Sequence, residues 1–127
     1  MKKTIEKHEQ LYRKVIMKPN FWKKDLGKPS SAVFKDSKGV SVDRDGERSE
    51  CDITETFKER FGAENMKAIV AIPAEFCYEI DTHLVYSPTE DNKYHAEIHA
   101  SVDKIPLGTS KARKLAKECT IIWKNSL

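Results

Sequence analysis

The stretch "YHAEIHASV", residues 94–102, constrains the fold most, because apolar and polar residues alternate along its whole length. Successive side chains of a β-strand point to opposite sides of a sheet, so this period of two predicts a strand with one buried face. The predicted inner face comprises Tyr94, Ala96, Ile98, Ala100 and Val102, and the outer face His95, Glu97, His99 and Ser101. A chain of 127 residues built around such a strand is expected to form one domain, residues 1–127.

Four further segments predict strands. "SSAVFK" and "GVSVDR" flank the turn Asp36-Ser37-Lys38-Gly39 and predict a β-hairpin. In the second of these strands Val40 and Val42 would point inward, whereas Ser41 and Asp43 would point outward. "MKAIVAIP", residues 66–73, is a continuous apolar run typical of a buried strand, and "THLVYSP", residues 82–88, predicts another strand.

Helical periodicity predicts three helices and one additional helical turn after Pro73. The first helix spans residues 4–19, begins at Thr4 and ends at Pro19, and its stripe comprises Ile5, His8, Tyr12, Val15 and Ile16. The second spans residues 51–62, with Asp52 as N-cap, Gly62 as terminator and the stripe Ile53, Phe57 and Phe61. The third lies in residues 109–127, with the stripe Ala112, Leu115, Ala116, Cys119, Ile122 and Trp123.

These elements together predict an α+β fold. A mainly antiparallel sheet would be packed by an N-terminal helix, a short middle helix and a C-terminal amphipathic helix. Residues 20–30 contain Asn20, Gly27 and Pro29 and predict a loop, which Phe21 and Trp22 would anchor to the core.

The charged residues are distributed unevenly along the chain. Residues 1–38 contain eleven Lys and Arg against four acidic residues, and residues 104–127 contain six against one. Residues 39–103 instead contain six basic and fifteen acidic residues. If the two ends meet in space, they form a basic face opposite an acidic one, which would steer an anionic partner or a self-association. The alternative is an ordinary solvated, lysine-rich surface.

Cysteine usage and hydropathy indicate the compartment. Cys51, Cys77 and Cys119 are odd in number and far apart, with no CxxC pair, so neither a disulfide framework nor a structural zinc site is expected. No apolar run approaches the roughly 20 residues that span a bilayer. The start "MKKTIEKHEQ" continues into polar residues, unlike a secretory signal. We therefore expect a cytoplasmic protein with no membrane contact.

No complete catalytic or cofactor motif is present. In a strand, His95 and His99 of "HAEIH" would lie about 13 Å apart, too far to share one metal ion, so we predict no metal site. Phosphoesterases that use paired His-x-Ser/Thr motifs need two copies, and only His99 is followed by Ser101. The chain contains no nucleophile elbow, dinucleotide fingerprint or P-loop, so no cofactor is expected.

One set of polar residues is a candidate catalytic site: Arg13, Ser31, Ser41, Glu97 and His99. If these side chains converge, they suit nucleotide or phosphate chemistry of a phosphoesterase-like or ADP-ribosyl-transfer-like kind. In the latter, arginine and serine hold the nicotinamide nucleotide and glutamate polarises the ribose. The alternative is that these polar residues simply keep the surface of a sheet in solvent.

The order of short motifs resembles a group of small bacterial proteins without an assigned activity. The motifs are "LYRKV", "KPSSAVFKDSKGVSVDR", "NKYHAEIHAS" and the basic segment "KARKLAKEC", which share a Ser-Ser-x-x-Phe, Ser-Val, His-Ala order along nearly the full chain. The resemblance implies a stand-alone bacterial domain, encoded in a mobile or defence-related locus, and implies no activity.

The first functional hypothesis is a small cytoplasmic binding or accessory protein that engages a protein partner through its charge-polarised surface and the edge of the hairpin. The candidate binding residues are Arg44, Arg48, Lys111, Arg113, Lys114 and Lys117. The alternative is the enzyme of phosphate chemistry, and nucleic-acid binding through the basic terminal helices is third. Whether the protein is an enzyme stays open, and a homo-oligomer is compatible with every alternative.

Overall fold

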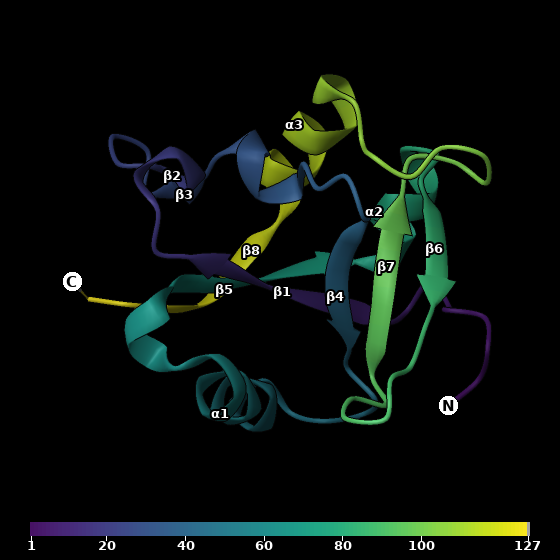
Figure 1. Ribbon diagram of the computed structural model, residues 1–127, viewed down its shortest axis with the longest axis horizontal. Helices are drawn as coiled ribbons and strands as arrows, with labels where there is room; N and C mark the ends of the chain where they lie inside the picture. The colour runs from purple at the N-terminus through teal and green to yellow at the C-terminus, as the bar shows by residue number, and fades with distance from the viewer. Residues whose placement is uncertain (127) are drawn as a thin grey trace.

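Six antiparallel strands form the main sheet of the computed structural model, which describes residues 1–126 (Figure 1). Their order across the sheet is β6-β7-β4-β1-β5-β8, and every neighbouring pair is antiparallel. The strands are β1 (Gln10–Ile16), β4 (Val40–Arg44), β5 (Met66–Pro73), β6 (His83–Tyr86), β7 (His95–His99) and β8 (Thr120–Lys124). The fold class is therefore α+β, as the sequence predicts.

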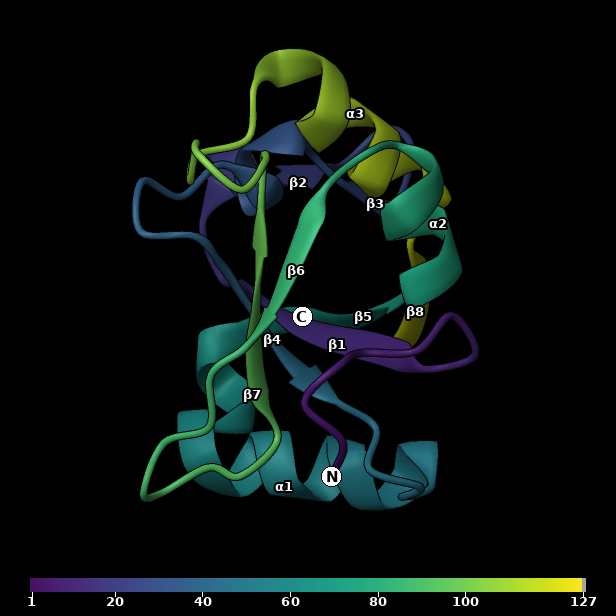
Figure 2. The ribbon, with the colours of Figure 1, turned by 90° about the vertical axis from the view of Figure 1, so that its right-hand side faces the viewer.

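Helices cover both faces of this sheet. The α-helices are α1 (Glu50–Phe61), α2 (Ala74–Glu79) and α3 (Thr109–Glu118), and the 3₁₀ turns are η1 (Pro19–Phe21), η2 (Ser31–Phe34) and η3 (Ala63–Asn65). A separate two-stranded ribbon consists of β2 (Trp22–Lys23) and β3 (Lys28–Pro29). Figures 1 and 2 show α1 on one side of the sheet and α2 and α3 on the other.

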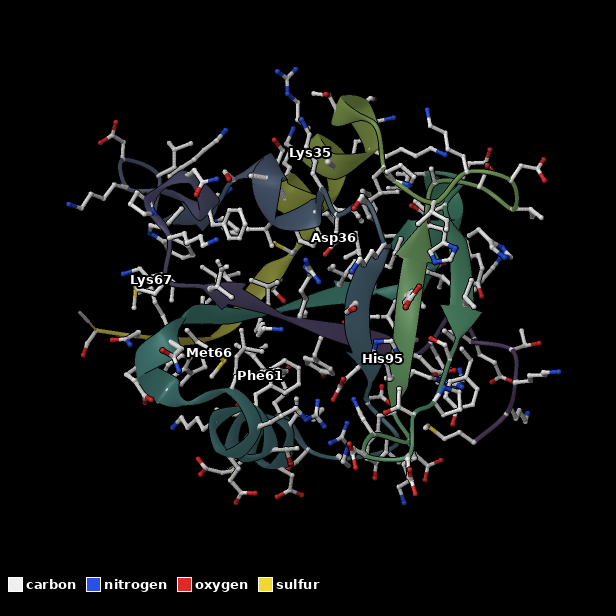
Figure 3. The ribbon with its side chains drawn as sticks, in the orientation of Figure 1. Lys35, Asp36, Phe61, Met66, Lys67 and His95 are labelled. Atoms are coloured by element: carbon white, nitrogen blue, oxygen red, sulfur yellow. The ribbon has the colours of Figure 1, made fainter. Side chains whose placement is uncertain are left out.

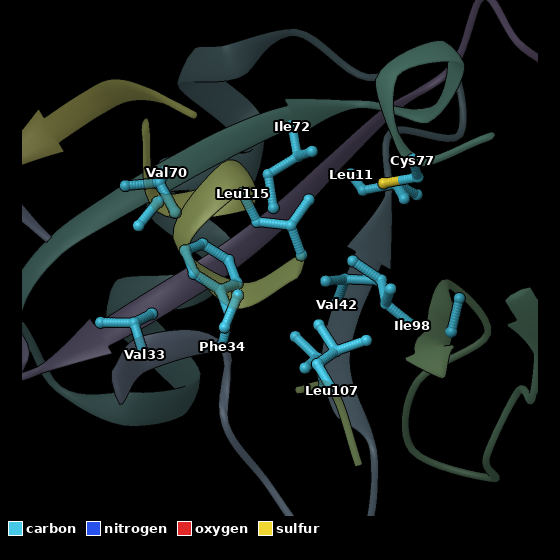
Figure 4. Close-up of a cluster of buried hydrophobic side chains, with 14 of the residues drawn as sticks. Leu11, Val33, Phe34, Val42, Val70, Ile72, Cys77, Ile98, Leu107 and Leu115 are labelled. Atoms are coloured by element: carbon cyan, nitrogen blue, oxygen red, sulfur yellow. The ribbon is translucent and has the colours of Figure 1, made fainter. Parts of the chain in front are cut away.

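The sheet separates two hydrophobic cores. The upper core, between the sheet and α2, α3 and η2, includes Leu11, Phe34, Val42, Ile72 and Leu115 (Figure 4). The lower core, between the sheet and α1, consists of Tyr12, Ile53, Phe57, Met66, Ile69 and Ala71. Because β1 and β5 supply residues to both cores, these two strands are buried on both faces.

The prediction of an N-terminal helix is wrong, because residues 10–16 form the inner strand β1. Leu11 and Val15 face the upper core and Tyr12 faces the lower core. A strand that buries both faces carries apolar residues on both, so the strict alternation of an amphipathic strand is lost. The remaining apolar spacing imitates a helical stripe, whereas aromatic and β-branched residues suit the sheet.

The predicted β-hairpin is also wrong, although its turn and its second strand are correct. Residues 31–34 form the 3₁₀ turn η2, and β4 pairs with β1 and β7, so both of its edges are already occupied. The turn closes through a 3.1 Å hydrogen bond from the Gly39 amide to the Asp36 carbonyl, with Gly39 at a φ of 101°. Val40 and Val42 are buried as predicted, but Asp43, which we expected to face solvent, is buried as well.

The predicted C-terminal helix is correct only in its first half. Ala112, Leu115 and Ala116 are buried on α3, but the helix ends at Glu118 and residues 120–124 form strand β8 beside β5. Ile122 and Trp123 therefore pack against the lower core instead of continuing the stripe of α3. The run Thr120-Ile121-Ile122 is β-branched, which favours a strand once an open sheet edge is in reach.

Most of the remaining predictions describe the structure closely. β5 and β6 form where strands are expected, and residues 74–79 form α2 after Pro73. β7 ends at His99, so Val102, which we expected to face the core, lies beyond the strand and is 78% exposed. Helix α1 carries the predicted stripe and ends at Gly62, but its N-cap is Ser49, whose hydroxyl accepts a hydrogen bond from the Asp52 amide. Phe21 and Trp22 pack against the upper core as predicted. Within residues 1–126 no helix is both long and apolar enough to cross a membrane.

Candidate functional site

A groove opens where β1 and β4 diverge. The two strands pair only at Leu11 and Tyr12, and the rest of β1 pairs with β5 alone. The groove has two lobes that share Arg13, Lys14 and Ser41. The larger lobe, about 290 Å³, is further lined by Ile16, Phe21, Ala32, Val33, Lys35 and Asp36. The smaller lobe lies toward Arg60, Phe61 and His95, and Figure 3 shows Lys35 and Asp36 on the opposite side of β1 from Phe61. We call this the β1–β4 groove.

Arg13 bridges two elements at the groove. Its Nε donates a 2.9 Å hydrogen bond to the Val33 carbonyl of η2, and its Nη1 donates one of 2.8 Å to the Ser41 carbonyl of β4. Burial lowers the pKa of the Arg13 guanidinium, which forms no salt bridge with any carboxylate in residues 1–126. Its Nη2 is left without a hydrogen-bond acceptor among these residues.

Lys14 is the second cation of the groove. Its Nζ lies 3.9 Å from the centre of the Phe61 ring. Burial, and then the charges of Arg13 and Arg60, lower the pKa of the Lys14 ammonium. Lys14 likewise forms no salt bridge within the described part of the chain. Arg13 and Lys14 are therefore two half-buried charges that repel each other.

The nearest buried carboxylate, Asp43, is already engaged. Only 4% of Asp43 is exposed. It accepts a 2.9 Å hydrogen bond from the Asn92 amide, and its oxygens lie 3.5 Å from Arg60 Nη1 and 4.0 Å from Arg48 Nη2. These contacts explain why this polar side chain can be buried. Asp43 thus pairs with Arg60 and Arg48, whereas Lys14 forms no salt bridge but lies within reach of the charges of Asp43 and Asp36.

The structure brings together part of the predicted catalytic set. Arg13 and Ser41 line the β1–β4 groove, and Glu97 lies directly opposite Ser41 on β7. His99 Nε2 lies 2.7 Å from Glu97 Oε1, and this pair packs over Gly39 instead of lining the groove. Ser31 lies apart, in a second groove beside α3. In residues 1–126 no three His, Cys, Asp or Glu side chains are arranged to hold a metal ion.

The second groove, which we call the α3 groove, is strongly basic. It has a volume of about 390 Å³ and is lined by Lys23, Leu26, Lys28, Pro29, Ser31, Arg113, Ala116 and Lys117. The lining thus contains four cations and no carboxylate. A 3.2 Å hydrogen bond from Lys35 to Thr109 also joins the segment before β4 to the start of α3. Residues 18–38 and α3, the basic segments of the sequence, therefore meet in space.

The opposite end of the molecule is acidic. Helix α1, which lies on the far side of the sheet from α3 in Figure 1, exposes Glu50, Asp52, Glu55 and Glu59. The first nine residues do not join the basic face, because the N-terminus lies away from α3 (Figure 1). The expected charge separation is therefore present in the fold, but with a smaller basic face than the sequence suggests.

The predicted binding residues have different environments. Arg113, Lys114 and Lys117 are exposed on α3. Lys111 instead donates hydrogen bonds of 2.7 and 2.8 Å to the carbonyls of Asp81 and Ala100, so it holds two loops together.

Arg44 and Arg48, the other two predicted binding residues, already have partners within the protein. Arg44 is only 2% exposed and forms a salt bridge with Glu9. Arg48 donates to the carbonyls of Arg44 and Asp45 and lies over the Tyr94 ring, with 3.5 Å between the guanidinium carbon and the ring centre. Arg44 is engaged because β4 lies against the N-terminal segment, and Arg48 is engaged because it packs against its own turn and against Tyr94.

Sequence reasoning missed Lys14, Lys23, Lys28 and Arg60 as groove residues. Lys14 and Arg60 lie off the apolar stripes of the helices that the sequence predicts, and nothing in the local pattern shows that β1 and α1 bring them together. Lys23 and Lys28 lie in a segment that the sequence predicts only as a loop. Comparison of the chain with family models, curated proteins and solved structures finds no match.

Proposed function

We propose that the protein is a small, non-enzymatic binding or accessory protein of the cytoplasm that engages an acidic surface of a protein partner through the α3 groove. The observation that carries the proposal is that four cations line this groove without a carboxylate among its lining residues. Three free cysteines, of which Cys77 is buried, are compatible with a reducing compartment. A mobile or defence-related locus is the genomic setting that the resemblance suggests.

The chemistry of the groove suits an acidic protein surface. The planar guanidinium of Arg113 can bind a carboxylate with two parallel hydrogen bonds, whereas Lys23, Lys28 and Lys117 supply point charges. Leu26, 64% exposed, adds an apolar contact at the rim. The acidic face of α1 would repel the same partner from the opposite side, so the charge separation orients the encounter.

Charge reversal in the groove tests the proposal. The double variant Arg113→Glu/Lys117→Glu is compared with Lys38→Glu/Lys104→Glu, which makes the same change of charge at exposed positions outside the groove. Each tagged protein captures partners from nuclease-treated host lysate, and the partner that the wild type captures in stoichiometric amount is then purified and titrated directly. We expect the groove variant to bind this partner at least tenfold more weakly, and the control to bind it with nearly the affinity of the wild type.

Two results would contradict the proposal. If both double variants bind the partner equally weakly, the affinity depends on the net charge of the protein and not on the α3 groove. Capture that disappears after nuclease treatment, together with binding of an RNA or DNA oligonucleotide whose affinity falls steeply with salt, would favour the nucleic-acid alternative.

A second candidate function is the enzyme of phosphate chemistry, favoured by the hydrogen-bonded pair of Glu97 and His99 beside Ser41. A carboxylate that holds an imidazole is the usual arrangement of a general base. Turnover of nucleotides or phosphate esters by the wild type, lost in Glu97→Gln and in His99→Ala, would favour this function over the first.

A further inference from the structure

The two walls of the α3 groove each carry a pair of like charges. On the β2–β3 ribbon, Lys23 lies directly opposite Lys28 in an antiparallel pair, so both side chains point to the same face. On α3, Arg113 and Lys117 are four residues apart and therefore share one side of the helix. Like charges are unfavourable at both of these spacings, whereas opposite charges would stabilise the same elements. The fold thus places four cations that repel one another around one groove.

None of these four cations is neutralised within the protein. Their side chains form no ion pair and no hydrogen bond among residues 1–126, although the neighbouring Lys35 and Lys111 are both hydrogen-bonded. Asp25 and Glu118, the acidic residues nearest to them in the sequence, do not line the groove. A ligand with negative charge would therefore offset the repulsion on both walls at once.

The shape of the groove favours a narrow ligand with acidic groups on two sides. Ala116 and Pro29 are buried and small, so they form the base between the exposed cations and let a ligand backbone approach closely. The Ser31 hydroxyl makes no hydrogen bond within residues 1–126 and adds a donor to the lining. In an extended peptide, successive side chains point in opposite directions, so neighbouring acidic residues can reach the ribbon and α3 in turn.

We propose that the α3 groove binds a short, extended acidic segment of the partner, in which consecutive Asp and Glu residues alternate between the two walls and an apolar residue contacts Leu26. This inference rests on the proposed function, because it names the part of the partner that the same groove binds. Runs of acidic residues are disordered when free and often serve as interaction tails. The volume of about 390 Å³ suits such a narrow segment better than a broad folded surface.

Fluorescence anisotropy with a labelled peptide tests this inference. The probe is a short peptide that contains a run of consecutive Glu and Asp residues followed by leucine. Two control peptides carry Gln and Asn in place of the acids, or Ser in place of the leucine. We expect saturable binding of the probe, no binding of the amide peptide, and weaker binding of the serine peptide.

Variants of the protein locate the peptide between the two walls. Lys28→Gln on the ribbon and Lys117→Gln on α3 should each weaken binding about threefold, because each removes one exposed charge partner of the peptide. Lys104→Gln, an exposed position outside the groove, should leave binding unchanged. Neither groove variant should lower the midpoint of thermal unfolding, because each removes a like-charge repulsion and breaks no side-chain contact.

The outcomes separate this inference from the proposed function. Weakening by Lys117→Gln alone, or tighter binding of a single-stranded DNA of the same charge, would overturn the extended acidic segment. It would also fall if the peptide did not bind while charge reversal at Arg113 and Lys117 still weakened binding of the captured partner. In that case the proposed function would stand. If the peptide binds between the walls but charge reversal leaves the partner bound, the inference holds and the proposed function is contradicted.

Discussion

Arg44, through its ion pair with Glu9, anchors the segment of the chain that precedes the first strand. Arg44 Nε and Nη2 each donate a 2.7 Å hydrogen bond to a different oxygen of Glu9, and Nη1 donates to the Lys2 carbonyl. Burial raises the pKa of Glu9, but the hydrogen bonds from Arg44 and from the Glu6 amide, with the charge of Arg44, lower it below its ordinary value. The pair thus connects β4 to the segment that precedes β1.

Replacement of Glu9 by Gln should destabilise the protein by about 3 kcal/mol at pH 7, because it leaves Arg44 as a buried charge without its partner. The folded-state pKa of Glu9 lies below the unfolded value, so its contribution is present above the unfolded pKa and is lost as the pH falls through the folded one. The difference between wild type and variant should therefore shrink below about pH 4. Urea unfolding at pH 7 and pH 3 measures both effects, and Glu6→Gln, at an exposed surface pair, should change little.

The three thiols should differ in reactivity. Burial raises the pKa of Cys77 to about 12 and that of Cys119 to about 11, whereas Cys51 is exposed on the first turn of α1. Because the thiolate is the reactive form, Ellman's reagent at pH 8 should rapidly modify only one thiol of the native protein, which we assign to Cys51. In urea it should modify all three. A rapidly reacting thiol that persists in Cys51→Ser would contradict this assignment.

Among the elements, α3 depends on its buried face for its position. Leu115 is fully buried in the upper core, and Lys114, its neighbour, is exposed. Leu115→Ala should cost about 3 kcal/mol in unfolding free energy, because it leaves a cavity in the core. Lys114→Ala should stay within about 0.5 kcal/mol of the wild type, since it removes no buried contact. Equal effects of the two substitutions on the urea midpoint would show that α3 is not docked as described.

The whole molecule should unfold as one unit, although it has two cores. The same strands, β1 and β5, form the wall between them, so neither core can persist when the sheet is lost. Leu115→Ala in the upper core and Phe57→Ala in the lower core should both shift a single transition that circular dichroism and tryptophan fluorescence report at the same midpoint. Trp22 packs near the upper core and Trp123 near the lower one, so the fluorescence signal samples both. Two separate transitions, each shifted by one variant only, would refute this coupling.

Charge separation is also a property of the whole molecule. The uneven distribution along the chain is visible in the sequence, but which basic segments meet depends on the packing of η2 against α3. The first nine residues carry basic charge as well, yet they lie near β4 and its buried Arg44. The composition along the chain therefore predicts the sign of the charge that each segment carries. Only the fold decides how large the basic and the acidic faces are.

The elements that the sequence predicts correctly are those whose residues obey a local rule. The alternation in β7, the apolar run of β5, the stripe of α1 ending at Gly62 and the turn at Gly39 each depend on interactions within a few residues. The side chains of β7 and of α1 each face one core, Gly39 carries one backbone constraint, and β5 is apolar at nearly every position, so neighbouring residues suffice to identify these elements.

The errors and the candidate site have a different origin, because they depend on partners far away in the sequence. The apolar spacing in β1 imitates that of a helix because both faces of the strand are buried. β8 forms because it pairs with the otherwise open edge of β5. The β1–β4 groove forms where the two strands stop pairing. The extent of that pairing depends on both strands, so it cannot be predicted from either segment alone. The half-burial of Arg13 and Lys14 follows from that divergence, so only the assembled sheet creates the groove.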